Sequence, residues 1–147
     1  MKKLGAHMSI AGGLDLAIQR GAQVHCEAVQ IFTKSSNQWK ARALDDAEVE
    51  RFKSARVEHG ITHVVAHDSY LINMASPDAA LFARSTAAFG EELDRCDRLD
   101  IPFLVAHPGS HVGSGLEAGI ARIVRAIDEL LTARPEGKAR ILLETTA

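Results

Sequence analysis

Short apolar runs alternate along the chain with longer segments in which apolar residues recur every three or four positions. The short runs are rich in Val, Ile, Leu and Phe, which is typical of strands that are covered on both faces. They predict five strands, at residues 3–9, 28–33, 62–69, 103–110 and 140–146. Because a longer segment separates each strand from the next, the pattern predicts repeated strand–helix units around a parallel sheet.

Helices are expected in the four longer segments between these strands. The third segment keeps one face apolar through Phe82, Phe89, Leu93 and Cys96. The fourth contains a wider apolar stripe made of Leu116, Ile120, Ile123, Val124, Ile127, Leu130 and Leu131. This stripe predicts a helix with one face directed towards the core.

Local signals predict where three of the helices begin or end. Ser76 followed by Pro77 suggests that the third helix opens with proline at its first helical position. Ser114 and Glu117 have the spacing of a capping box at the start of the fourth helix. Gly60 is expected to end the second helix, because glycine adopts the left-handed conformation common at that position.

The predicted fold class is α/β, with one structural unit over residues 1–147. No linker or low-complexity tract interrupts the strand–helix pattern, so no domain boundary is predicted. Successive right-handed crossovers would produce either an open sheet or part of a barrel. An eight-unit barrel typically needs about 250 residues, so this chain holds only a little more than half of one.

Composition narrows the class of protein. The chain is 46% hydrophobic and 24% charged, which is typical of a soluble globular domain. It contains no apolar run of about 18 residues, and its first residues lead into a strand rather than an apolar leader. We therefore predict a cytoplasmic protein with no membrane partner. Cys26 and Cys96 lack the spacing of a disulfide framework or a cysteine metal site.

Net charge limits how this chain could contact nucleic acid. The formal net charge is -2, which excludes a globally basic DNA-binding surface. Any contact with DNA must therefore be local, and the best candidate is the segment TKSSNQWKAR, in which Lys34, Lys40 and Arg42 surround Trp39. A solvated loop with Trp39 folded back on the core is the alternative.

Three predicted strands end in side chains that commonly bind metals: His67, His107 and Glu144. The carboxyl ends of parallel strands meet at one edge of a sheet, so side chains from neighbouring strands could gather around one ion. Two imidazoles and a carboxylate form the ligand set of many catalytic zinc sites. Each residue could instead be a hydrogen-bonded structural group. His7 and Asp68 are expected to support the ligands from a second layer.

Five sequence segments resemble the motifs of a known family: GAHMSIAGGL, FTKSSNQW, HDSYLIN, HPGSH and LLETTA. They resemble the successive blocks of the endonuclease IV family of abasic-site endonucleases, in family order and over essentially the whole chain. The resemblance implies the N-terminal half of a (β/α)8 TIM barrel, truncated to about five strands and four helices. It also implies a DNA-repair enzyme that uses a zinc-activated hydroxide to hydrolyse the phosphodiester 5′ to an abasic site.

The resemblance also implies roles for individual residues. It makes His67, His107 and Glu144 zinc ligands, with Glu144 a catalytic ligand that bridges two ions. Tyr70 and Leu71 would belong to a loop that enters the duplex beside the missing base, where an apolar wedge offsets part of the kinking cost. Asn37 stands where the family often has arginine, so Lys34 and Lys40 are expected to compensate through phosphates.

The complete family enzyme holds three zinc ions, and its remaining ligands lie on later strands. With three ligands, this chain is expected to hold at most about one ion well and to be weak or inactive alone. Self-association or a complementing C-terminal half would cover the open strand edges. Two alternatives stay open: a metal-dependent sugar isomerase or epimerase, and a catalytically silent half-barrel that acts as an assembly module.

Overall fold

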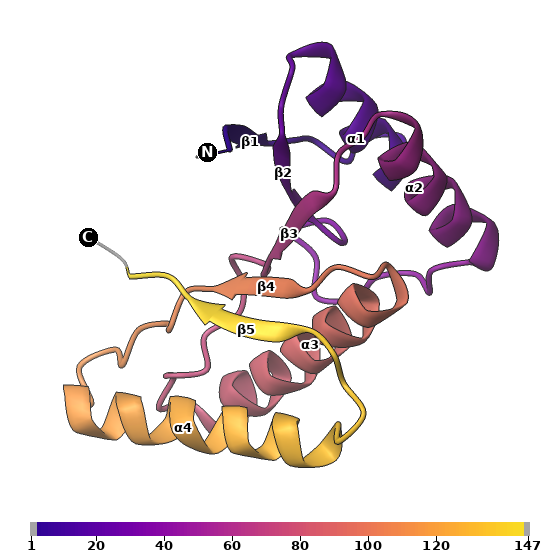
Figure 1. Cartoon of the computed structure of the whole chain (residues 1–147). Coiled ribbons are helices and arrows are strands. Elements are labelled where there is room, and N and C mark those ends of the chain that lie inside the picture. Colours follow the sequence, from indigo (N-terminus) through magenta and orange to yellow (C-terminus); the bar gives the residue numbers. More distant parts are fainter. Residues whose placement is uncertain (1–2, 146–147) are drawn as a thin grey trace.

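The computed structural model describes residues 3–145 and contains nine elements in alternating order (Figure 1). The strands are β1 (Gly5–His7), β2 (Ala28–Phe32), β3 (His63–His67), β4 (Phe103–Ala106) and β5 (Arg140–Leu143). The helices are α1 (Leu14–Gln23), α2 (Asp46–Glu58), α3 (Ala79–Arg98) and α4 (Leu116–Ala133). All five predicted strands and the helices between them are confirmed, although Thr146 of the last predicted strand lies outside the described residues.

The five strands form one parallel sheet in the order β1-β2-β3-β4-β5. His67 of β3 pairs with Val105 of β4, and Ala106 of β4 pairs with Leu143 of β5. The helices lie on the convex side of the curved sheet (Figure 1). This is the arrangement of part of a closed barrel, as the length of the chain had suggested.

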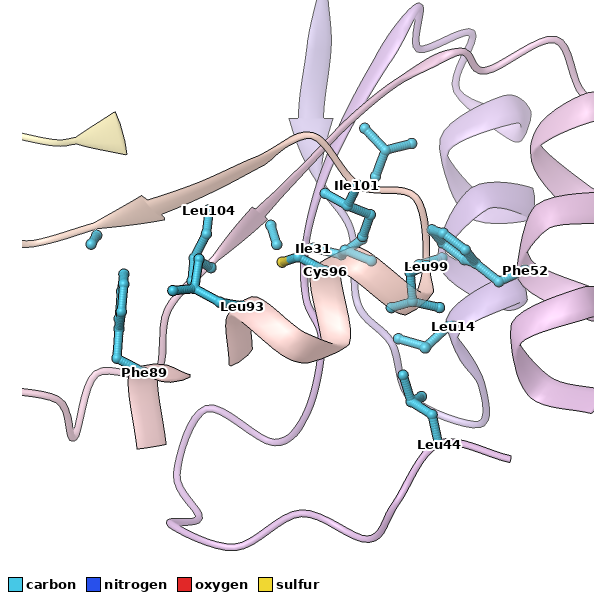
Figure 2. Close-up of a cluster of buried hydrophobic side chains, with 14 of the residues drawn as sticks. Leu14, Ile31, Leu44, Phe52, Phe89, Leu93, Cys96, Leu99, Ile101 and Leu104 are labelled. Carbon is cyan, nitrogen blue, oxygen red and sulfur yellow. The ribbon is translucent and has the colours of Figure 1, made fainter. Parts of the chain in front are cut away.

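The core lies between the sheet and the helices, because alternate strand residues point towards them. The helix-facing positions of the three central strands are buried: Val29, Ile31, Val64, Ala66, Leu104 and Ala106. Phe52 of α2 and Phe89 of α3 pack onto this layer with no exposed surface (Figure 2). The other strand face borders an open concavity of about 550 Å³ that includes His7, Gln30 and Val65.

The start of α3 differs from the expected one, whereas the end of α2 is confirmed. The N-cap of α3 is Asp78, whose carboxylate accepts the backbone N–H of Leu81 at 2.7 Å. Pro77 therefore precedes the cap rather than occupying the first helical position, and Asp78 satisfies one of the free backbone N–H groups of the first turn. Gly60 follows α2 with a φ of 66°, in the left-handed conformation expected after a helix.

The capping box expected for α4 is absent. The N-cap is Gly115, and no side chain caps this end of the helix. The hydroxyl of Ser114 instead donates to the backbone oxygen of His111 at 2.7 Å, which stabilises the preceding turn. A serine hydroxyl can bond to any nearby backbone group, so sequence spacing alone did not decide its partner.

The apolar stripe of α4 is only partly buried. Leu130 packs into the core and is 7% exposed, but four other members are largely exposed: Leu116, Ile120, Val124 and Leu131. Helical periodicity identifies an apolar face without showing what covers it. β1 and β5 are likewise the open edges of the sheet. Within residues 3–145, no helix combines the length and apolar character needed to span a membrane.

Candidate metal centre

His67, His107 and Glu144 come together at the carboxyl edge of the sheet. One ligand atom from each lies within 4.8 Å of the others. A carboxylate oxygen of Glu144 is 3.2 Å from Nε2 of His67 and 4.0 Å from Nε2 of His107. The two imidazole rings have centroids 5.0 Å apart. The sheet therefore gathers the three groups that the strand-end pattern singled out.

Strand pairing explains why these side chains converge. β3, β4 and β5 are adjacent and parallel, so their last residues reach the same edge. The backbone N–H of Glu144 donates to the oxygen of Ala106 at 2.9 Å, which continues the β4–β5 ladder and places Glu144 beside His107. His67 ends β3 on the other side of His107. The ligand set is thus a consequence of register and alternation.

The hydrogen bonding of His67 defines which ring nitrogen is free. Its Nδ1 donates to the backbone oxygen of Asp68 at 2.8 Å, so the proton of the neutral ring lies on Nδ1. Nε2 then presents a lone pair to the Glu144 carboxylate, also an acceptor, only 3.2 Å away. Two facing acceptors repel each other unless a proton or a cation lies between them. This arrangement suits a metal ion.

Asp68 lies beside the imidazole of His67 rather than among the ligand atoms. Its side chain is 2% exposed, and one oxygen lies 3.4 Å from Nδ1 of His67. The backbone of His107 favours the ionised form of this carboxyl. Burial, followed by the charge of Glu92, raises the pKa of Asp68 to about 8. This position is compatible with an orienting role towards His67, which stays a prediction.

His7 lies further from the cluster, on β1. Its ring centroid is 6.5 Å from that of His67, and Gln30 donates to its Nδ1 at 3.1 Å. Burial lowers the pKa of His7, and the charge of protonated His67 lowers it further. At this distance His7 fits a supporting role better than that of a fourth ligand.

The loop after β3 brings Tyr70 next to the cluster. Tyr70 is 65% exposed, and its ring lies 5.3 Å from Phe32 and 5.9 Å from His67, measured between centroids. Leu71 is half-buried beside it. An exposed aromatic ring at the rim of a polar cluster is available to a ligand. The loop expected to contact DNA and the candidate metal ligands thus share one edge.

Of the three residues in the β2–α2 loop that were expected to contact DNA, two are exposed and one is buried. Asn37 and Lys40 are exposed and free to meet a ligand. Lys34 is only 6% exposed; its ammonium lies 3.2 Å from the Glu92 carboxylate and donates to the oxygen of Gln38 at 2.9 Å. The expected phosphate contact of Lys34 does not fit this placement, because its charge is already paired inside the protein.

Sequence reasoning missed Glu92, the partner of Lys34. It lies on α3 and is 1% exposed, and burial raises its pKa while the Lys34 charge opposes that rise. One signal could have identified it: Glu92 sits three residues after Phe89 and four before Cys96, on the apolar face of its helix. An ionisable side chain at such a position needs a buried partner.

Similarity to known proteins extends over the whole chain. The sequence profile of the family described as "Xylose isomerase-like TIM barrel" matches residues 18–147. A protein of Chloroflexus aurantiacus named "Probable endonuclease 4" is 49% identical over 147 residues, which are 100% of this chain and 52% of that protein. Its counterpart from Geobacter sulfurreducens is 48% identical over 98% of the chain and 49% of its own length. The chain thus spans about half the length of these relatives.

Comparison with solved structures likewise matches the chain to about half of a longer protein. Endonuclease IV from Thermus thermophilus superposes on 99% of the chain with a TM-score of 0.86 and 32% identity, using 52% of its own chain. A D-psicose 3-epimerase superposes on 97% of the chain with a TM-score of 0.70, but only 18% of residues are identical. The second likeness concerns the fold alone.

Proposed function

Because the chain belongs to the xylose isomerase-like TIM barrel family, we propose that it supplies part of the active site of a DNA-repair endonuclease. The proposed reaction is hydrolysis of the phosphodiester 5′ to an abasic site. The observation that carries it is the convergence of His67, His107 and Glu144 at one sheet edge. The motif resemblance to endonuclease IV is confirmed by the relatives of that name.

Zinc fits the three candidate ligands. Ligand atoms around tetrahedral zinc, at bond lengths of 2.0–2.1 Å, lie about 3.4 Å apart. The closest pair here, from His67 and Glu144, is separated by 3.2 Å, and all three atoms lie within 4.8 Å. When bound, the ion would supply Lewis-acid activation of water and of the phosphodiester. We propose His67, His107 and Glu144 as its ligands.

The chain's own residues would position the substrate around that centre. Tyr70 is exposed beside the cluster, and with Leu71 it would fill the gap left by the missing base. Exposed Lys40 would contact a phosphate, and Asn37 would offer an amide to the backbone or a base edge. Asp68 would hold the imidazole of His67 in place, and His7 would pack beside that ring. A cytoplasmic location is part of this proposal.

The proposed activity is weak in this chain alone. The chain covers about half of each relative, and its three ligands can hold about one ion of a three-zinc centre. β1 and β5 are open edges, and four apolar residues of α4 are exposed. A complementing half-barrel, or a second copy of the chain, would cover these surfaces. A silent assembly module is the alternative.

Metal binding tests the proposal directly. Zinc added to metal-free chain should raise its melting temperature, since a ligand at 100 times its dissociation constant stabilises the folded state by about 2.7 kcal/mol. His67→Ala and Glu144→Gln should abolish most of that rise, whereas Glu136→Gln, at an exposed carboxylate before β5, should not. Equal zinc responses in all of these proteins would contradict the assigned ligands.

Cleavage of abasic duplex tests the reaction. The zinc-loaded chain should cut a duplex containing an abasic site slowly, and His107→Ala should remove that activity. Addition of the other half of a related barrel should raise the rate. Zinc binding without any cleavage under either condition would favour the assembly module instead.

A further inference from the structure

Lys34 and Glu92 form an ion pair in the protein interior. Their side chains are 4% and 1% exposed, and the ammonium nitrogen lies 3.2 Å from a carboxylate oxygen. Neither belongs to the cluster of candidate metal ligands. Burying two charges costs several kcal/mol per ion, and an apolar pair of similar volume often stabilises a fold equally well. Packing alone therefore does not explain this pair.

The Glu92 carboxylate has a second partner that an apolar residue could not serve. Its Oε1 accepts the backbone N–H of Ser69 at 3.2 Å. The hydroxyl of Ser69 donates to the oxygen of Ser36 at 2.6 Å and accepts the N–H of Leu71 at 3.3 Å. One carboxylate therefore anchors the backbone immediately before Tyr70.

Lys34 links the Glu92 carboxylate to the neighbouring β2–α2 loop. Besides its pairing with Glu92, its ammonium donates to the oxygen of Gln38 at 2.9 Å. The two loops that carry the proposed DNA contacts are therefore joined through α3. Asn37 lies in one of them, and Tyr70 with Leu71 lies in the other.

We propose that Glu92 is a positioning residue for lesion recognition, and that Lys34 is its buried counter-ion rather than a phosphate contact. This inference rests on the proposed function. Glu92 holds the β3–α3 loop through Ser69, so that Tyr70 and Leu71 are presented to the gap at an abasic site in a fixed conformation. A preorganised loop loses less conformational freedom on binding, which improves affinity for the lesion.

Two double variants separate anchoring from charge and from stability. Lys34→Met combined with Glu92→Met removes both charges and the acceptor for Ser69. Lys34→Met combined with Glu92→Gln removes both charges but keeps a carbonyl oxygen as that acceptor. Because neither leaves an unpaired buried charge, both should fold, and chemical denaturation verifies this for each.

Hydrogen exchange measures the anchor without any DNA. The amides of Ser69 and Leu71 should exchange about tenfold faster in the Met/Met variant than in wild type, as expected for one lost hydrogen bond. The Met/Gln variant should stay within about twofold of wild type. Equal exchange in the two double variants would overturn the anchoring role of Glu92.

Binding to DNA measures the functional consequence. The probe is a short duplex with one tetrahydrofuran abasic analogue, compared with the undamaged duplex by fluorescence anisotropy. The ratio of affinities for damaged and undamaged duplex should be about tenfold lower in the Met/Met variant than in wild type. The Met/Gln variant should keep the wild-type ratio. If both variants keep the full preference, Glu92 does not position the recognition loop.

Salt dependence tests the assignment of Lys34. A lysine that neutralises a phosphate contributes about 0.9 to the slope of log affinity against log salt concentration. The Met/Gln variant should retain the wild-type slope, whereas Lys40→Met should reduce it by about that amount. A reduced slope in the Met/Gln variant would make Lys34 a phosphate contact. A wild-type chain without preference for damaged duplex would overturn the proposed function, while hydrogen exchange would still decide whether Glu92 anchors the loop.

Discussion

Replacing Asp68 with asparagine should remove a large pH dependence from the stability of the metal-free chain. In the folded state the Asp68 carboxyl has a pKa of about 8, against an ordinary value of 3.8. Between these pH values the unfolded chain has released this proton and the folded chain still holds it. The unfolded state then binds fewer protons, so the stability contributed by this group falls as pH rises.

The raised pKa sets the size of the effect. A group that is protonated in the folded chain and ionised in the unfolded chain changes the free energy of unfolding by about 1.4 kcal/mol per pH unit. From pH 5 to pH 7, wild-type chain should therefore lose about 2–3 kcal/mol that the Asp68→Asn variant keeps. Asparagine cannot ionise, and its side-chain oxygen can still accept a hydrogen bond from a neighbouring donor.

Urea unfolding in the presence of a chelator measures the difference. Free energies of unfolding at pH 5, 6 and 7 are compared for wild type, Asp68→Asn and Asp128→Asn, whose carboxyl is exposed on α4. The free energy of unfolding of the Asp128→Asn control should depend on pH as it does in wild type. Only that of Asp68→Asn should depend on pH more weakly. Parallel curves for Asp68→Asn and wild type would show that Asp68 is ionised in the folded chain across this range.

Three further predictions concern packing and surface. Phe89→Ala should lower the free energy of unfolding by about 3–5 kcal/mol, because this ring is fully buried; a loss below 1 kcal/mol in denaturant would contradict its place in the core. Gly109→Ala should lower it by about 1–3 kcal/mol, since φ is 93° and the added Cβ would lie 2.3 Å from Oδ1 of Asn73; an unchanged melting temperature would disprove that close contact. Ile120→Gln with Val124→Gln should reduce self-association in sedimentation velocity, because both side chains are exposed on one face of α4; unchanged association would exclude this face as the contact.

Much of the fold could be predicted because its determinants are local or follow general rules. Strand length, alternation and helical period located every element, and parallel crossovers limited the fold to an open sheet or part of a barrel. The same rules brought His67, His107 and Glu144 to one edge. The helix caps were harder, because several polar side chains near Asp78 and Gly115 competed for the same backbone groups.

The sequence by itself thus determined the strand–helix order and the three candidate ligands, since both depend on short-range periodicity. Only the tertiary structure decided the environment of individual side chains. Lys34 and Lys40 lie in the same polar loop, yet α3 covers the first and leaves the second exposed. Likewise, the α4 stripe is apolar whether or not anything packs on it. Burial and pairing depend on residues distant in the chain, and local pattern does not contain that information.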